Sequence, residues 1–115
     1  MKKLLSALFA LTLITAACTK KDVFNKDEIY YFYSEKCGHC IEASSYINRA
    51  HPDLKMVKID VATTEGYNML LKAVETFKLG NRVGTPLFII GDNHIMGWSP
   101  RQQAKFETLV KPYLK

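Results

Sequence analysis

Two of the three cysteines form the tetrad Cys37-Gly38-His39-Cys40. Two thiols separated by two residues can close a small disulfide ring across the first turn of a helix, where unpaired N–H groups and the positive end of the helix dipole favour an anion. The thiolate is the species that attacks a disulfide. The tetrad therefore predicts thiol–disulfide exchange, with Cys37 as the exposed nucleophile and Cys40 as the more buried thiol that resolves the mixed disulfide.

Three residues beside the cysteines are expected to tune this chemistry. Gly38 lets the turn tighten and leaves Cys37 accessible. A protonated His39 favours the thiolate of Cys37, which stabilises the reduced form and makes the disulfide a better oxidant. The ammonium of Lys36 stabilises the same thiolate if it points toward it and has no such effect if it points into solvent.

A second candidate feature lies far away in the sequence, at Gly84-Thr85-Pro86. Pro86 cannot donate a hydrogen bond to a sheet, so it belongs at the first position of a strand. A cis Thr85–Pro86 bond would expose the backbone of Thr85 for pairing with an extended substrate. An ordinary trans proline stays open at this point, because only about 5–6% of X–Pro bonds in folded proteins are cis.

The elements that must position these residues follow from the spacing of apolar side chains. Strands are predicted at 29–33, 55–61, 87–90 and 94–96, with a tight turn at 91–93. Helices are predicted after the tetrad as far as His51-Pro52, from Thr63-Thr64 to Gly80-Asn81, and from a capping box at Ser99 to Pro112. The second helix is expected to bury an apolar face made of Tyr67, Leu70, Leu71, Val74 and Phe77.

The resulting order β-α-β-α-β-β-α predicts an α/β fold. The first two strands, joined through a helix, form a right-handed parallel unit, and the last two form an antiparallel hairpin. These connections predict a central mixed sheet of about four strands that is flanked by helices on both faces.

The first residues are expected to be removed from the mature protein. A positive start is followed by residues 4–17, which carry no charge. This run is shorter than the roughly 20 residues of a transmembrane helix but suits a signal peptide, so residues 1–17 are assigned to one. Thr15-Ala16-Ala17-Cys18 resembles a bacterial lipobox, although Thr15 stands where Leu is usual. We therefore expect lipidation of Cys18, with ordinary signal-peptidase cleavage as the alternative.

This assignment divides the chain into a signal peptide (1–17), an N-terminal tether (18–28) and a domain (29–115). It also explains the odd number of cysteines, since Cys18 is set aside for lipid. A lipid thioether with several acyl chains holds a domain on a membrane surface. The predicted location is accordingly the cell envelope or periplasm, with the protein anchored in a membrane as a lipoprotein.

The tetrad at a helix start, Thr85-Pro86 before a strand and the order of the elements together resemble the thioredoxin fold over residues 23–115. The Cys-Gly-His-Cys tetrad is that of protein disulfide isomerase domains. The resemblance implies a cis Pro86 that faces the cysteines, and a groove around Thr85, Pro86 and Trp98 that binds extended substrates. Two positions depart from the family: Tyr31 replaces a buried acid that assists proton transfer to Cys40, and Lys36 replaces a tryptophan. A water or another group must then relay the proton, or turnover is slower.

The expected function is a protein thiol–disulfide oxidoreductase that acts on exported cysteine-containing proteins together with a redox partner protein. The direction of electron flow is left open. No cofactor is expected, because the dithiol itself carries the electrons, and a monomer is expected. The formal charge of +5 falls to +3 without residues 1–17, and no basic stripe interleaved with aromatic residues is present, so nucleic-acid binding is not expected.

Two alternatives remain. A copper(I) or other metal carrier would use Cys37 and Cys40 with His39, His51 or His94, although the sequence lacks a second CxxC or an HxxxH for structural zinc. A binding module with an inert, structural disulfide is the other alternative. The exposed helix-start position of the tetrad argues against this alternative, because structural disulfides are usually buried and resist reduction.

Overall fold

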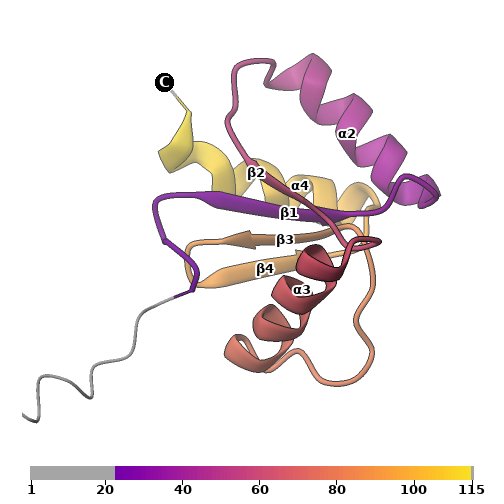
Figure 1. Ribbon diagram of the computed structural model, residues 1–115. Helices are drawn as coiled ribbons and strands as arrows, with labels where there is room; N and C mark the ends of the chain where they lie inside the picture. The colour runs from indigo at the N-terminus through magenta and orange to yellow at the C-terminus, as the bar shows by residue number, and fades with distance from the viewer. Residues whose placement is uncertain (1–22, 115) are drawn as a thin grey trace, which may run out of the picture.

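In the computed structural model, which describes residues 23–114, strands and helices follow one another in the predicted order (Figure 1). The elements are β1 (Ile29–Tyr33), α2 (Gly38–Ala50), β2 (Val57–Asp60), α3 (Thr64–Thr76), β3 (Leu87–Ile90), β4 (Asn93–Met96), α4 (Pro100–Val110) and a short 3-10 turn, η2 (Lys111–Tyr113). The predicted signal peptide and Cys18 lie outside the described residues.

The four strands form one mixed sheet in the order β2-β1-β3-β4, which confirms the predicted α/β class. β1 pairs in parallel with β2, with Tyr30 opposite Val57, as expected for two strands joined through α2. β3 lies antiparallel between β1 and β4. The end of β1 and the start of β3 therefore meet at the same end of the sheet, where Phe32 lies opposite Leu87.

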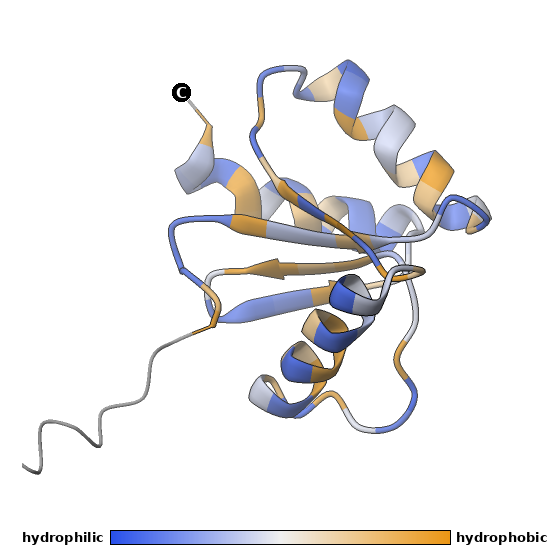
Figure 2. Cartoon of the chain, in the orientation of Figure 1, coloured by the Kyte–Doolittle hydropathy of each residue, from blue (hydrophilic) through white to orange (hydrophobic). Residues whose placement is uncertain are grey.

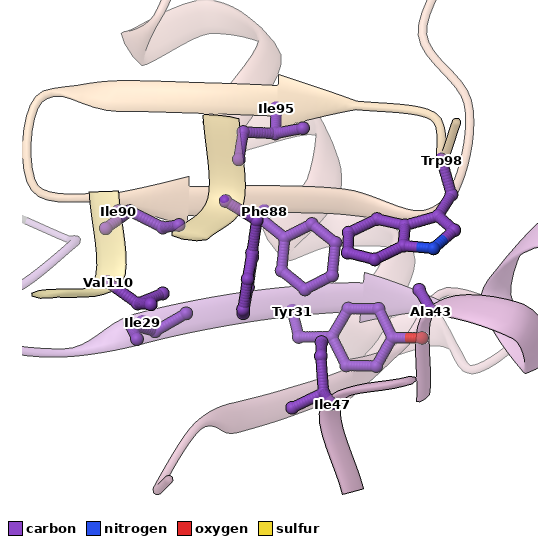
Figure 3. Close-up of a cluster of buried hydrophobic side chains, with 10 residues drawn as sticks. Ile29, Tyr31, Ala43, Ile47, Phe88, Ile90, Ile95, Trp98 and Val110 are labelled. Carbon is purple, nitrogen blue, oxygen red and sulfur yellow. The ribbon is translucent and has the colours of Figure 1, made fainter. Parts of the chain in front are cut away.

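Alternate residues of the strands face opposite sides of the sheet, and each side has its own core. One core joins the sheet to α2 and α4, and Figure 3 shows part of it. Its buried members are Ile29, Tyr31, Ala43, Ile47, Phe88, Ile90, Ile95, Trp98, Phe106 and Val110. The other core joins the sheet to α3, and its buried members are Phe24, Tyr30, Phe32, Leu70, Ala73, Leu87 and Ile89. Because both faces of β3 are covered, all four of its residues are buried and the strand is hydrophobic along its length (Figure 2).

The face that α3 buries differs from the predicted one. Leu70 is buried as expected, but Tyr67 and Leu71 are exposed, so their assignment to the apolar face was wrong. The helix is rotated so that Gly66 faces β2, and a Cβ on Gly66 would lie 1.9 Å from the carbonyl oxygen of Asp60. The start of α3 therefore packs too closely on the end of β2 to leave room for a side chain at position 66.

The end of α3 also differs from the prediction. The helix ends at Thr76 rather than at Gly80-Asn81, and the chain turns at Lys78, whose φ is 51°. The N–H of Leu79 donates to the carbonyl of Val74 at 3.0 Å. This hydrogen bond is that of the Schellman motif, in which glycine usually occupies the left-handed position after the helix. Here Lys78 occupies that position.

The last two predicted boundaries shift slightly. The hairpin loop has two residues, since Asn93 pairs with Ile90 and belongs to β4 rather than to the turn. Ser99 is the N-cap residue of α4 with Pro100 next to it, as predicted. Its hydroxyl contacts the side chain of Gln102 instead of capping a backbone N–H, so the predicted capping box does not form.

The packed part of the chain begins before β1. Phe24 lies in the segment 18–28 that was predicted as a tether, yet its side chain is buried. Its ring makes edge contacts with those of Tyr30, Phe32 and Phe77, at centroid distances of 5.0, 6.3 and 5.7 Å. The core beside α3 therefore extends to Phe24.

Candidate functional site

Cys37 and Cys40 form a disulfide at the start of α2, directly after the loop that leaves β1. Their Cα atoms lie 5.1 Å apart. Cys37 is the N-cap residue of the helix, and its Sγ accepts a hydrogen bond from the N–H of Cys40 at 3.1 Å. A sulfur atom thus occupies the place of the usual capping oxygen, where backbone N–H groups favour negative charge.

The two cysteines differ in exposure in the way the sequence predicted. Cys37 is half-buried, while Cys40 is only 2% exposed. An external thiol can therefore reach the sulfur of Cys37 far more easily than that of Cys40. If the pair takes part in disulfide exchange, this asymmetry favours Cys37 for the contact with an external thiol and Cys40 for the internal step.

The loop before β3 meets the disulfide. The Thr85–Pro86 peptide bond is cis, as the family resemblance implied, and the carbonyl oxygen of Thr85 lies 3.4 Å from the Sγ of Cys37. In the disulfide this sulfur carries no hydrogen, so the contact is a hydrogen bond only when Cys37 is a thiol. Pro86 is fully buried, and its carbonyl accepts from the N–H of Gly97 at 2.8 Å. The antiparallel pairing of β1 with β3 brings together groups 48 residues apart in the sequence.

The predicted tuning residues surround the disulfide on the solvent side. Gly38, His39 and Lys36 are all exposed. Nδ1 of His39 lies 3.0 Å from the Oε1 of Glu42, one helical turn further on. Sequence reasoning did not single out Glu42, although its spacing of three residues from His39 on a predicted helix was a usable signal.

Trp98 lies in the core instead of lining an open groove. It is 8% exposed, and its ring packs against those of Tyr46, Phe88 and Phe106, as Figure 3 shows for Phe88. Its position does not support the predicted direct contact with substrate. Its packing instead anchors the chain next to Gly97, whose N–H donates a hydrogen bond to the carbonyl of Pro86.

The hydroxyl groups of Tyr31 and Ser44 lie next to Cys40, on the buried side of the disulfide. Tyr31 is fully buried in the sheet, and its hydroxyl donates to the carbonyl of Cys40 at 3.0 Å. The same hydroxyl lies 2.7 Å from the Oγ of Ser44. Burial raises the pKa of Tyr31 above its usual value of about 10, the hydrogen bond with Ser44 lowers it to a smaller extent, and the charge of Tyr33 adds to the rise. Ser44 was not predicted as functional, although it follows Cys40 by one helical turn.

Cavities lie both beside the disulfide and away from it. A shallow cavity of about 270 Å³ adjoins the site and is lined by Tyr33, Ser34, Glu35, Cys40, Ile41 and Ser44. A larger one of about 610 Å³ lies by the far end of α2 and is lined by Asp27, His51, Pro52, Asp53, Leu54, Lys55, Tyr113 and Leu114. The larger cavity contains neither cysteine of the tetrad, so size alone does not identify the reactive site.

Of the three histidines of the metal-carrier alternative, only His39 lies at the cysteines. His51 caps the other end of the 13-residue helix α2 and pairs with Glu107. His94 lies on β4, where burial and then the charge of Lys105 lower its pKa. Within residues 23–114 the structure shows no group of three or more His, Cys, Asp or Glu side chains placed to hold a metal ion.

None of the helices in that same range is long and apolar enough to cross a membrane.

Comparisons of the chain with models of known protein families, with curated proteins and with solved structures find no match. The functional argument therefore rests on the site itself: one disulfide at a helix start, with one half-buried and one buried sulfur.

Proposed function

We propose that this chain is a thioredoxin-like protein thiol–disulfide oxidoreductase that works through the Cys37–Cys40 pair. The observation that carries the proposal is the placement of the half-buried sulfur of Cys37 between a helix N-terminus and the backbone carbonyl of Thr85. The helix start stabilises the thiolate of the reduced form. The order of the elements and the positions of the tetrad and of Thr85-Pro86 are those that the family resemblance implies, and this supports the thioredoxin-like fold.

The proposed reaction exchanges one disulfide for another. In the reducing direction, the Cys37 thiolate attacks a substrate disulfide, a Cys37–substrate bond forms, and the first substrate sulfur leaves as a thiolate. Cys40 then loses its proton and attacks Cys37, which forms the Cys37–Cys40 disulfide and releases the second substrate thiolate. Two electrons pass to the substrate, and the two protons lost by the cysteines are taken up by its two sulfurs. The reverse sequence oxidises a substrate dithiol, and the redox partner protein sets the direction.

The proposed substrates are extended segments of exported proteins that contain cysteine. Thr85 is a half-buried residue beside the sulfur of Cys37, where its backbone can pair with that of a bound segment. Ile41 follows Cys40 and is 60% exposed, which offers an apolar contact next to the site. With the lipobox at Cys18, we place the protein as a monomer at a membrane of the cell envelope.

Reduction of insulin by dithiothreitol tests this proposal. The wild-type protein should accelerate the reaction, and Cys37→Ser should abolish the acceleration. Cys40→Ser should instead accumulate a mixed disulfide between Cys37 and the substrate, visible on a non-reducing gel. A Cys37→Ser variant that remains as active as the wild type would contradict the proposal and favour an inert structural disulfide.

A further inference from the structure

The reaction requires Cys40 to exchange a proton while it is shielded from bulk water. Cys40 is 2% exposed, so its thiol cannot be deprotonated freely by solvent. Leaving a thiolate in such a place without a hydrogen bond is unfavourable, because burial penalises the charged form. A side chain or a water held beside Cys40 must therefore accept the proton when Cys40 attacks and stabilise the thiolate when Cys40 leaves.

The two hydroxyls beneath the disulfide have a defined arrangement of hydrogens. The Tyr31 hydroxyl has a single hydrogen, which it donates to the carbonyl of Cys40 at 3.0 Å. In the 2.7 Å contact with Ser44, the Ser44 hydroxyl is therefore the donor and the Tyr31 oxygen the acceptor. This assignment leaves the lone pairs of the Ser44 Oγ free to accept a hydrogen bond from another donor.

Ser44 also lies where a proton of Cys40 could reach solvent. It follows Cys40 by four residues, so both side chains lie on the same side of α2. Both residues line the cavity of about 270 Å³, together with Ser34 and the exposed Glu35. A space of this size that is open to the surface can hold several water molecules, since each takes up about 30 Å³ in the liquid.

We propose that the hydroxyl of Ser44, held in position by Tyr31, relays the proton between Cys40 and this cavity; the proposal rests on the oxidoreductase function proposed above. When Cys40 attacks the mixed disulfide, the Ser44 hydroxyl turns its hydrogen from the Tyr31 oxygen to a water in the cavity. The S–H proton of Cys40 then moves to the Ser44 Oγ as the serine hydrogen passes to that water. The water delivers that proton to a departing substrate thiolate. In the reverse direction, the Ser44 hydrogen turns from the Tyr31 oxygen to the departing Cys40 thiolate and protonates it, as water in the cavity returns a proton to the Ser44 Oγ.

Tyr31 itself serves as a positioning residue in this arrangement. Its side chain lies between Phe88 and Ile47 with the hydroxyl directed toward α2 (Figure 3), and its ring stacks on that of Phe88 at a centroid distance of 4.6 Å. Burial raises the pKa of its hydroxyl, so the phenol stays protonated at neutral pH and is a poor base. Tyr31 can therefore position Ser44 through the hydrogen bond between their hydroxyls, but it cannot relay the proton in place of Ser44.

A matched pair of substitutions isolates the Ser44 hydroxyl. Ser44→Thr and Ser44→Val have nearly the same shape and differ in one oxygen atom. Each reduced protein is mixed with a fluorescent peptide disulfide in a single turnover, and the formation and decay of the mixed disulfide are followed after acid quenching. Ser45→Ala, at the exposed neighbouring position of α2, is the control.

The proposal expects Ser44→Val to form the mixed disulfide at the wild-type rate and to resolve it about 100-fold more slowly at pH 7, the lower end of the range for general acid–base catalysis. Ser44→Thr and Ser45→Ala should resolve it at close to the wild-type rate. The defect should shrink at high pH, where hydroxide removes the proton directly. Tyr31→Phe, which keeps the stacked ring, should also slow resolution but leave formation unchanged.

Equal rates of resolution in Ser44→Val and Ser44→Thr would overturn the relay. That result is distinct from a failure of the oxidoreductase function, because the function fails only if no variant that retains Cys37 forms the mixed disulfide. If Ser44→Val unfolds, as judged by circular dichroism, Tyr31→Phe decides: resolution at the wild-type rate with Phe at position 31 would equally overturn the proposal.

Discussion

The carboxylate of Glu107 on α4 lies 2.8 Å from the Nε2 of His51, the residue that ends α2. The hydroxyl of Tyr46, also on α2, donates to the same carboxylate oxygen. One acid thus receives two hydrogen bonds from the helix that carries the disulfide. Because the contact lies at the opposite end of α2 from Cys37, it fixes that helix on α4 without touching the site.

This contact predicts a pH dependence of stability. The hydrogen bond from Tyr46 lowers the pKa of Glu107 below its ordinary value of 4.5, burial opposes this, and the hydrogen bond and charge of His51 lower it further. A lowered pKa in the folded protein stabilises the fold above the ordinary pKa, and the stabilisation is lost as the pH falls through the folded value. Glu107→Gln should therefore cost about 0.5–1 kcal/mol at pH 7, a modest amount because solvent screens a side chain that is 37% exposed.

Urea denaturation of wild type and Glu107→Gln between pH 7 and pH 3 measures this effect. The difference in the free energy of unfolding should shrink as the pH falls below the ordinary pKa of 4.5 and through the lower pKa of folded Glu107. Glu75→Gln, at an exposed position of α3, should leave the free energy of unfolding unchanged. A difference for Glu107→Gln that stays constant over the whole range would contradict the assignment.

Gly66 is predicted to be the glycine that the fold tolerates least well as alanine. Its added Cβ would lie 1.9 Å from the backbone oxygen of Asp60 and 2.8 Å from the Oγ1 of Thr63, so α3 must move away from β2. Gly66→Ala should lower the free energy of unfolding by about 3 kcal/mol, the upper part of the range for overpacking. Gly84→Ala, where nothing lies within 4 Å of the added atom, is the control. Similar melting temperatures for the two variants would count against this close approach.

His39→Ala should make the cysteine pair more reducing. The imidazole lies between the cysteines in sequence and, when protonated, favours the thiolate of the reduced form. Its loss should shift the potential by about 30 mV toward more negative values, which is a tenfold change in the equilibrium constant of a two-electron couple. Equilibration with glutathione measures the shift. Asn48→Ala, exposed near the far end of α2, should leave the potential unchanged.

Ile41→Asp should impair exchange with protein substrates selectively. Ile41 is 60% exposed beside the buried Cys40, where an apolar side chain can contact a bound segment. A charge there should lower kcat/KM about 10-fold for insulin, the effect of losing one well-buried apolar contact on binding, and should change the rate with the small disulfide of glutathione much less. Leu71→Asp, at a comparably exposed apolar position on α3, tests the effect of charge alone. An equal loss with both substrates would show that Ile41 does not contact the polypeptide.

The sequence predicted the elements and the paired cysteines well because the signals there are local. The run at 29–33, the CxxC spacing and the turn at Gly91 depend on neighbouring residues only. The buried face of α3 was predicted wrongly at Tyr67 and Leu71, because hydrophobic spacing favours large residues, whereas the close approach to Asp60 selects Gly66. That approach is set by the sheet, which a helical pattern does not encode.

The polar side chains near the tetrad were harder to predict, because they too depend on tertiary packing. Tyr31 was noticed only as a departure from an expected acid, since its role depends on a hydroxyl contact with Ser44 across 13 residues. Glu42 and Ser44 each lie one helical turn from a tetrad residue, and spacing alone does not distinguish them from other polar residues of the helix. What distinguishes these two residues is the direction of their side chains, which the packing of α2 determines.

The pairing of β1 with β3 has a consequence for the growing or partly unfolded chain. Cys37 and Cys40 depend only on a local turn and can form their ring early, but the carbonyl of Thr85 reaches them only after the strand 48 residues later has docked. Under the proposed function, a chain interrupted before residue 85 would hold the dithiol without the backbone against which a substrate is proposed to align. The proposed oxidoreductase would then acquire its selectivity later than its reactivity, when β3 docks at the centre of the sheet.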